Sequence, residues 1–143
     1  MKTVLKIALG AVVGFLALAP ASSPASSRAS VERSIRTAFT EFKSGLRHAD
    51  GKLTCSRMTL RYRQQILSAA ASGGVAGVGC ETFFDVNGRD IYNDIKSKKL
   101  LSISVKGSRA KAKTDAGSLI IFVRSSGRWR LDSARQPAPE GAR

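Results

Sequence analysis

Three residues of this chain belong to the types most often used in catalysis or in covalent cross-links. Cys55 and Cys80 are the two cysteines, and His48, the single histidine, stands two positions before Asp50. The cysteines could form a disulfide, remain free thiols, hold a metal ion or act as a redox pair. The histidine could share a proton with the carboxylate as a general acid and base. Each of these chemistries needs neighbours that the rest of the sequence must supply.

The cysteine pair lacks the partners for a metal or redox site. A tetrahedral zinc site normally takes four ligands, and a single histidine cannot complete one beside two cysteines. A thioredoxin-like pair has Cys-x-x-Cys spacing, whereas residues 56–79 separate Cys55 from Cys80. We therefore expect no metal ion and no cofactor.

The N-terminal residues indicate export. Lys2 and Lys6 precede an apolar run from Ile7 to Ala19, and the small residues Ala19-Pro20-Ala21 follow. This layout is typical of a secretory signal peptide, here cleaved near Ala21, which would deliver the mature chain to the periplasm or the extracellular medium. A membrane anchor is the alternative, but the run is shorter than the roughly 20 apolar residues of a spanning helix.

Export gives the cysteines an oxidising environment, in which two cysteines of a small chain usually pair. We predict a disulfide between Cys55 and Cys80, with two buried free thiols as the alternative. Closing a loop of this length should stabilise the fold by about 3.5 kcal/mol in the chain-entropy model.

The elements around these residues begin with an amphipathic helix. Apolar residues recur at helical spacing from Val31 to Leu46, so we predict a helix from Ser30 to about His48. At its end, His48 and Asp50 are expected to act as a C-terminal cation and an N-cap rather than as a catalytic dyad. A second helix should start at Ser56 or Thr59 and run to Ala70.

The segment that follows is rich in glycine. Residues 68–79 are predicted as a loop that Cys80 holds in place, because they include four glycines and no charge. Two short helical turns, at residues 80–86 and 90–95, should be separated by a turn at Asn87-Gly88.

The last third of the chain alternates with the period of a strand. Leu101–Val105, Arg109–Lys113, Leu119–Val123 and Arg128–Asp132 are joined by short turns, so they predict an antiparallel meander. The fold class is therefore α+β: an amphipathic N-terminal helix and shorter helices packed on a curved antiparallel sheet of about four strands.

The chain carries 24 Lys and Arg against 10 Asp and Glu, a net charge of +14. Such an excess attracts anionic partners, which outside the cytoplasm include envelope polymers and lipid surfaces. Arg109, Lys111 and Lys113 share one face of a strand and form a candidate polyanion face, with a solvated surface as the alternative. Specific nucleic-acid binding is not expected, because aromatic residues do not alternate with the basic ones.

Several of these features together resemble small exported bacterial members of the nuclear transport factor 2-like superfamily. The resemblance spans residues 31–134. It rests on the following residues: His48-Ala49-Asp50-Gly51, Cys55, Cys80, Lys106 to Ala112 and Gly127 to Asp132. Composition adds a signal peptide (1–21), a flexible leader (22–30) and a mobile tail (135–143) on either side of this one domain (31–134).

The resemblance implies a cone-shaped fold in which the sheet wraps the long helix and leaves a pocket at the open end. Candidate pocket residues are Tyr62, Phe83, Tyr92 and Trp129, with ordinary core packing as the alternative. In the superfamily this pocket is an active site in some members, a ligand site in others and closed in the rest. We expect a non-enzymatic domain that binds a small apolar ligand or an envelope component; the alternative is a small isomerase or dehydratase. Residues 73–95 depart from the family pattern where its third helix should lie.

Overall fold

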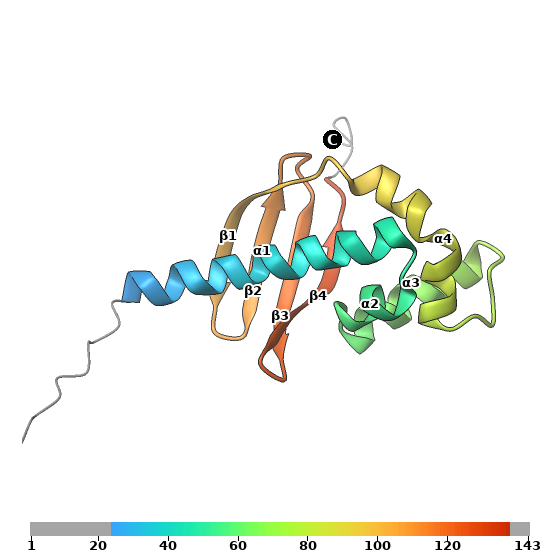
Figure 1. The fold of residues 1–143 in the computed structure, drawn as a ribbon, viewed down its shortest axis with the longest axis horizontal. Coiled ribbons are helices and arrows are strands. Elements are labelled where there is room, and N and C mark those ends of the chain that lie inside the picture. The colour runs from blue at the N-terminus through green and yellow to red at the C-terminus, as the bar shows by residue number, and fades with distance from the viewer. Residues whose placement is uncertain (1–23, 138–143) are drawn as a thin grey trace, which may run out of the picture.

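The computed structural model describes residues 24–137 as a long helix lying across a four-stranded sheet, with three shorter helices gathered at one end (Figure 1). The helices are α1 (Pro24–His48), α2 (Gly51–Ser56), α3 (Leu60–Ser72) and α4 (Cys80–Ile95). The strands are β1 (Leu100–Lys106), β2 (Arg109–Thr114), β3 (Leu119–Ser125) and β4 (Arg128–Arg135). The predicted α+β class is confirmed.

The sheet is the predicted antiparallel meander, with strand order β1-β2-β3-β4, and it is not closed. Its inner face packs against the apolar stripe of α1, and the core includes Ile35, Phe39, Phe42, Leu46, Ala110, Ala112, Ile120, Phe122 and Leu131. The small Ala110 and Ala112 of β2 are almost fully buried under this helix. Because strand side chains alternate between faces, the residues between them point to the outer face.

Helix α1 begins earlier than its apolar stripe. Residues 24–30, which we predicted as part of a flexible leader, form its first turns. Local polar bonds support them: Arg28 Nε lies 3.2 Å from Glu32 Oε1, and the Ser30 hydroxyl donates to the Ser27 carbonyl at 2.7 Å. Ionic pairs four residues apart stabilise a helix without any burial.

The start of each of the next two helices follows the predicted caps. The Asp50 side chain accepts a hydrogen bond from the Leu53 backbone N–H at 2.8 Å, and the Thr59 hydroxyl accepts one from Tyr62 N at 3.2 Å. Each cap satisfies an N–H group that has no partner inside its helix. Helix α3 continues to Ser72, so the predicted loop begins at Gly73 and is shorter than expected.

The predicted turn at Asn87-Gly88 is wrong, because α4 runs unbroken through both residues. The Asn87 side chain donates to the Phe83 carbonyl at 2.9 Å, which keeps it inside the helix. Gly88 faces the end of α1, where a Cβ atom would come within 3.1 Å of the Leu46 carbonyl oxygen. The glycine therefore serves a close approach of two helices rather than a turn.

The short segment between α2 and α3 pairs with the edge of the sheet. Leu131 N donates to the Arg57 carbonyl and Thr59 N donates to the Leu131 carbonyl, both at 2.8 Å, and this places Met58 in a parallel bridge with Leu131. Beside this contact the β3–β4 register shifts between Ile121 and Phe122. Asp132 is the extra residue of the resulting bulge on β4.

The predicted signal peptide at residues 1–21 lies outside the described residues. Within residues 24–137, no helix combines the length and the apolar character needed to cross a membrane. In the same part of the chain, no three His, Cys, Asp or Glu side chains gather as a metal site would require.

Candidate functional site

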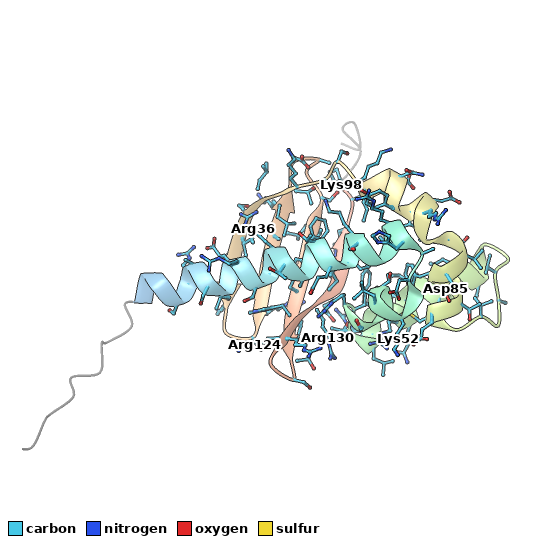
Figure 2. All side chains as sticks on the ribbon, viewed as in Figure 1. Arg36, Lys52, Asp85, Lys98, Arg124 and Arg130 are labelled. Atoms are coloured by element: carbon cyan, nitrogen blue, oxygen red, sulfur yellow. A yellow bond between two sulfur atoms is a disulfide. The ribbon has the colours of Figure 1, made fainter. Side chains whose placement is uncertain are left out.

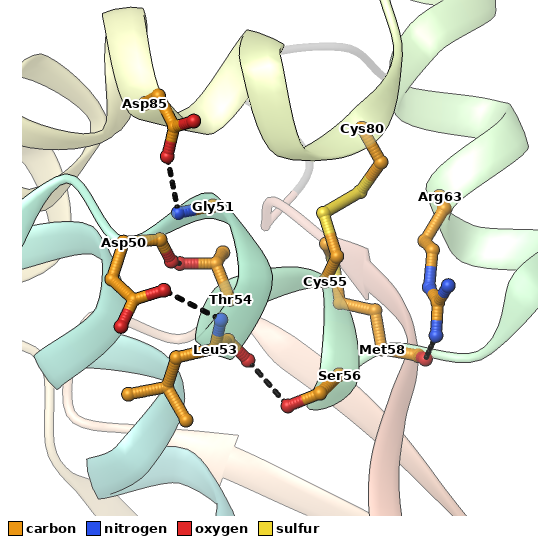
Figure 3. The surroundings of a disulfide bond; sticks show 10 residues. All are labelled: Asp50, Gly51, Leu53, Thr54, Cys55, Ser56, Met58, Arg63, Cys80 and Asp85. Carbon is orange, nitrogen blue, oxygen red and sulfur yellow. Dashed lines mark hydrogen bonds between the residues drawn. A yellow bond between two sulfur atoms is a disulfide. The ribbon is translucent and has the colours of Figure 1, made fainter.

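The predicted disulfide is confirmed. Cys55 in α2 and Cys80 at the start of α4 are joined, with their Cα atoms 6.2 Å apart (Figure 3). Close to this bond, Gly51 N donates to Asp85 Oδ1 at 2.7 Å, so a second contact holds the same two helices together. The segment between the two cysteines contains α3 and the glycine-rich loop, and the disulfide holds the two ends of this segment together.

Helices α1, α3 and α4 line a cavity of about 290 Å³ against the ends of β3 and β4. We call it the apolar pocket. Its wall consists mainly of aromatic and aliphatic side chains: Phe39, Phe42, Tyr62, Ile66, Phe83, Phe84, Ile91, Ile95, Ile120, Leu131 and Ala134. Lys98, Ser118, Arg135 and Gln136 complete the lining with polar groups. Sites for small ligands have this composition, a mainly apolar wall with a few polar groups.

Tyr62 supplies the main polar group of the apolar wall. Burial raises the pKa of its phenol above 10.0, so the hydroxyl keeps its proton at neutral pH. This hydroxyl makes no hydrogen bond to any residue within 24–137, whereas the Ser118 hydroxyl already donates to Gln136 Oε1 at 3.4 Å. Tyr62 can therefore donate a hydrogen bond to a bound molecule.

The four candidate pocket residues lie in three different places. Tyr62 and Phe83 line the apolar pocket, where the Phe83 ring meets the Phe84 ring edge-on at 5.1 Å. Tyr92 packs against the core from α4 but is not part of the pocket lining. Trp129 is buried near the β3–β4 hairpin and lines a different cavity. The aliphatic wall was not anticipated, because its residues come from separate elements.

His48 and Asp50 take up separate structural tasks. His48 is exposed in the last turn of α1, and its Nδ1 lies 2.9 Å from the Ser44 carbonyl oxygen. Asp50 caps α2. Neither residue lines the apolar pocket.

The predicted polyanion face lies on the outer side of the sheet. Arg109, Lys111 and Lys113 are exposed at alternate positions of β2, and Lys106 of β1 pairs with Arg109. We call these four residues the basic outer face. A hollow of about 430 Å³ is lined by Arg109 and Lys111 of this face and also by Arg61 and Arg135.

Asp132 is a buried carboxylate at the bulge of β4. Its side chain is 8% exposed, forms an ion pair with Arg61 and accepts a hydrogen bond from the Thr59 hydroxyl at 2.8 Å. Burial alone would raise the pKa of Asp132, but hydrogen bonds from Arg61 and Thr59 and the charges of Arg61 and Arg109 outweigh it and lower the pKa. Its role is to fix the start of α3 on the bulge of β4.

Comparisons with known proteins give one structural match to report. No protein-family model matches the sequence, and no curated protein matches it. The fold is similar to the crystal structure of an NTF2-like protein of unknown function from Shewanella baltica OS155. The two chains are 13% identical, with a TM-score of 0.43, and the match covers 77% of this chain and 97% of that one.

Proposed function

We propose that this protein is an exported, disulfide-stapled, non-enzymatic domain that binds a small apolar ligand. The observation that carries this proposal is the apolar pocket, a cavity of about 290 Å³ with an aromatic and aliphatic wall. Ligand sites in proteins start at about 300 Å³, so the molecule should be small. Burying its apolar surface would contribute about 25 cal/mol per Å² before the costs of binding.

The polar groups of the pocket favour a ligand with one polar end. The Tyr62 hydroxyl is free to donate, and Lys98 and Arg135 bring positive charge to the lining. A ligand whose apolar body fills the pocket and whose polar atom meets Tyr62 would satisfy both kinds of surface.

A small isomerase or dehydratase is the second candidate. Such an enzyme needs a group that accepts a proton near neutral pH. The described lining of the apolar pocket contains no carboxylate and no imidazole, and the raised pKa of Tyr62 makes its phenolate scarce. These features favour binding over proton transfer.

A fluorescence titration tests the binding proposal. We expect the secreted protein to bind the neutral probe N-phenyl-1-naphthylamine saturably, with one site per chain. Ala134→Trp should fill the pocket and weaken binding at least about tenfold, whereas Ala69→Trp, on the exposed side of α3, should not change it. Non-saturable binding, or equal binding by both variants, would contradict the proposal.

Export is tested separately by the mass of the protein recovered outside the cytoplasm. The expected chain starts at Ser22 and carries no free thiol. Recovery of a chain that still contains residues 1–21, with thiols that react before reduction, would contradict this part of the proposal.

A further inference from the structure

A second cavity, of about 590 Å³, lies on the other side of α1 from the apolar pocket. Its walls come from residues 30–41 of α1, from Arg57 directly after α2, and from the β3–β4 hairpin. Figure 2 shows Arg124 near this hairpin. Four arginines from these separate elements line it: Arg33, Arg57, Arg124 and Arg128. We call this cavity the arginine cleft.

The positive charge of the arginine cleft is largely uncompensated. Glu41 is the single carboxylate among the described lining residues, and it forms an ion pair with Arg57 at 3.2 Å. Within residues 24–137, the side chains of Arg33, Arg124 and Arg128 have no hydrogen-bond or ion-pair partner. A concave surface lined by one sign of charge concentrates ions of the opposite sign.

The Arg57 side chain is largely buried and lies beside Glu41 in the arginine cleft. It is 18% exposed, and the backbone of Arg57 bonds to both Thr54 and Leu131. Its Nε is buried and, although close to Glu41, lacks an aligned hydrogen bond. A guanidinium that is already held in position loses little conformational freedom when an anion binds.

The arrangement fits a multivalent anion better than a single carboxylate. Glu41 already supplies one carboxylate, and three further guanidinium groups remain around the space. A phosphate group carries a charge of about −1.5 to −2 at neutral pH and offers three acceptor oxygens. Arginine binds such oxygens through pairs of parallel N–H donors. We propose that the arginine cleft binds a phosphate group, whether of a soluble phosphate or of a lipid headgroup. This site does not depend on the apolar pocket being occupied.

Two double variants separate the cleft from the general positive charge of the protein. Arg124→Gln with Arg128→Gln removes two exposed cations from the cleft, and Lys111→Gln with Lys113→Gln removes two from the basic outer face. Both variants have the same net charge. Because the substituted side chains are exposed, both should fold, and thermal unfolding without phosphate should confirm it.

Binding is measured with two probes: inorganic phosphate by calorimetry, and phosphatidylcholine vesicles with and without phosphatidic acid by flotation. The cleft variant should lose about tenfold or more in affinity, since hydrogen bonds between charged groups are the strong ones, and the outer-face variant should lose about twofold or less. Binding of inorganic phosphate assigns the site to a soluble phosphate, and binding of phosphatidic acid vesicles alone assigns it to a headgroup. Equal loss in both variants, loss in the outer-face variant alone, or no binding of either probe by the unmodified protein would overturn the proposal.

Discussion

The apolar pocket and the arginine cleft share helix α1 but are built from different neighbours. At the pocket, Phe39 and Phe42 of α1 face α3, α4 and the sheet, so several layers enclose an apolar space. At the cleft, Ser34 and Thr37 of the same helix face the β3–β4 hairpin, with the residue after α2 beside them, and the space stays polar. Where α3 and α4 pack beside α1 the molecule forms an apolar pocket, and where α1 faces the β3–β4 hairpin it forms a charged cleft.

The largest expected effect comes from removing the disulfide between α2 and α4. Replacing both cysteines, Cys55→Ser with Cys80→Ser, should lower the free energy of unfolding by about 3.5 kcal/mol, because the unfolded chain regains the freedom of the loop. Urea titration measures this loss, and the reduced unmodified protein should match the variant. In the folded variant, phosphate binding should stay within about twofold, since β4 still holds Arg57. Equal urea midpoints with and without the disulfide would contradict the role of the bond.

The close contact between α2 and α4 at Gly51 is tested next. A Cβ atom on Gly51 would come within 2.0 Å of the Glu81 carbonyl oxygen, so Gly51→Ala should force α2 and α4 apart and cost about 3 kcal/mol. Gly73→Ala is the matched control, because its nearest contact would be an ordinary 3.4 Å. Thermal unfolding should show a large shift for the first and almost none for the second. Similar shifts would mean that the junction tolerates the separation.

Asp132→Asn should destabilise the protein by about 2 kcal/mol, because it replaces charge-assisted hydrogen bonds to Arg61 and Thr59. The lowered pKa of Asp132 means that its contribution is complete above the unfolded value of about 3.9 and is lost as the pH falls through the folded pKa. The unmodified protein should therefore lose more stability than the variant on acidification below about pH 4. Parallel pH profiles from denaturant titrations would rule out this coupling.

A smaller effect is expected from removing the Tyr62 hydroxyl, which tests whether this group hydrogen-bonds to a ligand or Tyr62 only packs against it. Tyr62→Phe keeps the ring and removes the hydroxyl, so a ligand that accepts its hydrogen bond should lose about 0.5–1.5 kcal/mol of binding free energy. The affinity for N-phenyl-1-naphthylamine should change little, because its apolar surface dominates, and phosphate binding in the cleft should not change. Unchanged affinity for a ligand with a carbonyl or carboxylate end would show that Tyr62 serves packing alone.

The smallest effect concerns the outer side of the sheet. Lys111→Gln with Lys113→Gln should leave stability unchanged within about 0.5 kcal/mol. If the basic outer face attracts polyanions, this variant should leave a heparin column at lower salt than the unmodified protein does. Flow-through of the unmodified protein at low salt would instead support a simply solvated surface.

The elements with regular burial were predictable from the sequence. The apolar stripe of α1 and the alternation in β2 each mark one buried face, and Asp50 and Thr59 act as caps through contacts only a few residues away. The prediction of a turn at Asn87-Gly88 was wrong because the role of Gly88 depends on a distant contact. The glycine allows α4 to approach the end of α1, which the local sequence does not indicate.

The sites were less predictable than the fold because they are assembled from distant segments. Ile66 and Ile95 resemble any core residue until α3 and α4 are placed beside α1. Asp132 lies at the end of a regular alternating pattern, and its partners Thr59 and Arg61 are 73 and 71 positions away in the sequence. Arg33 and Arg128 are ordinary surface residues until the hairpin and α1 face each other.

The bridge between Met58 and Leu131 also limits how copies of this chain could associate. It occupies the middle of the β4 edge, so a strand from another molecule cannot extend the sheet there. The β1 edge pairs with no other backbone segment among the described residues; Arg36 donates to the Leu100 carbonyl at 2.6 Å, and Leu101 is 65% exposed. A sheet with one open edge can join a second copy edge to edge. Adding a third copy through the sheet would require the β4 edge to release its contact with Met58.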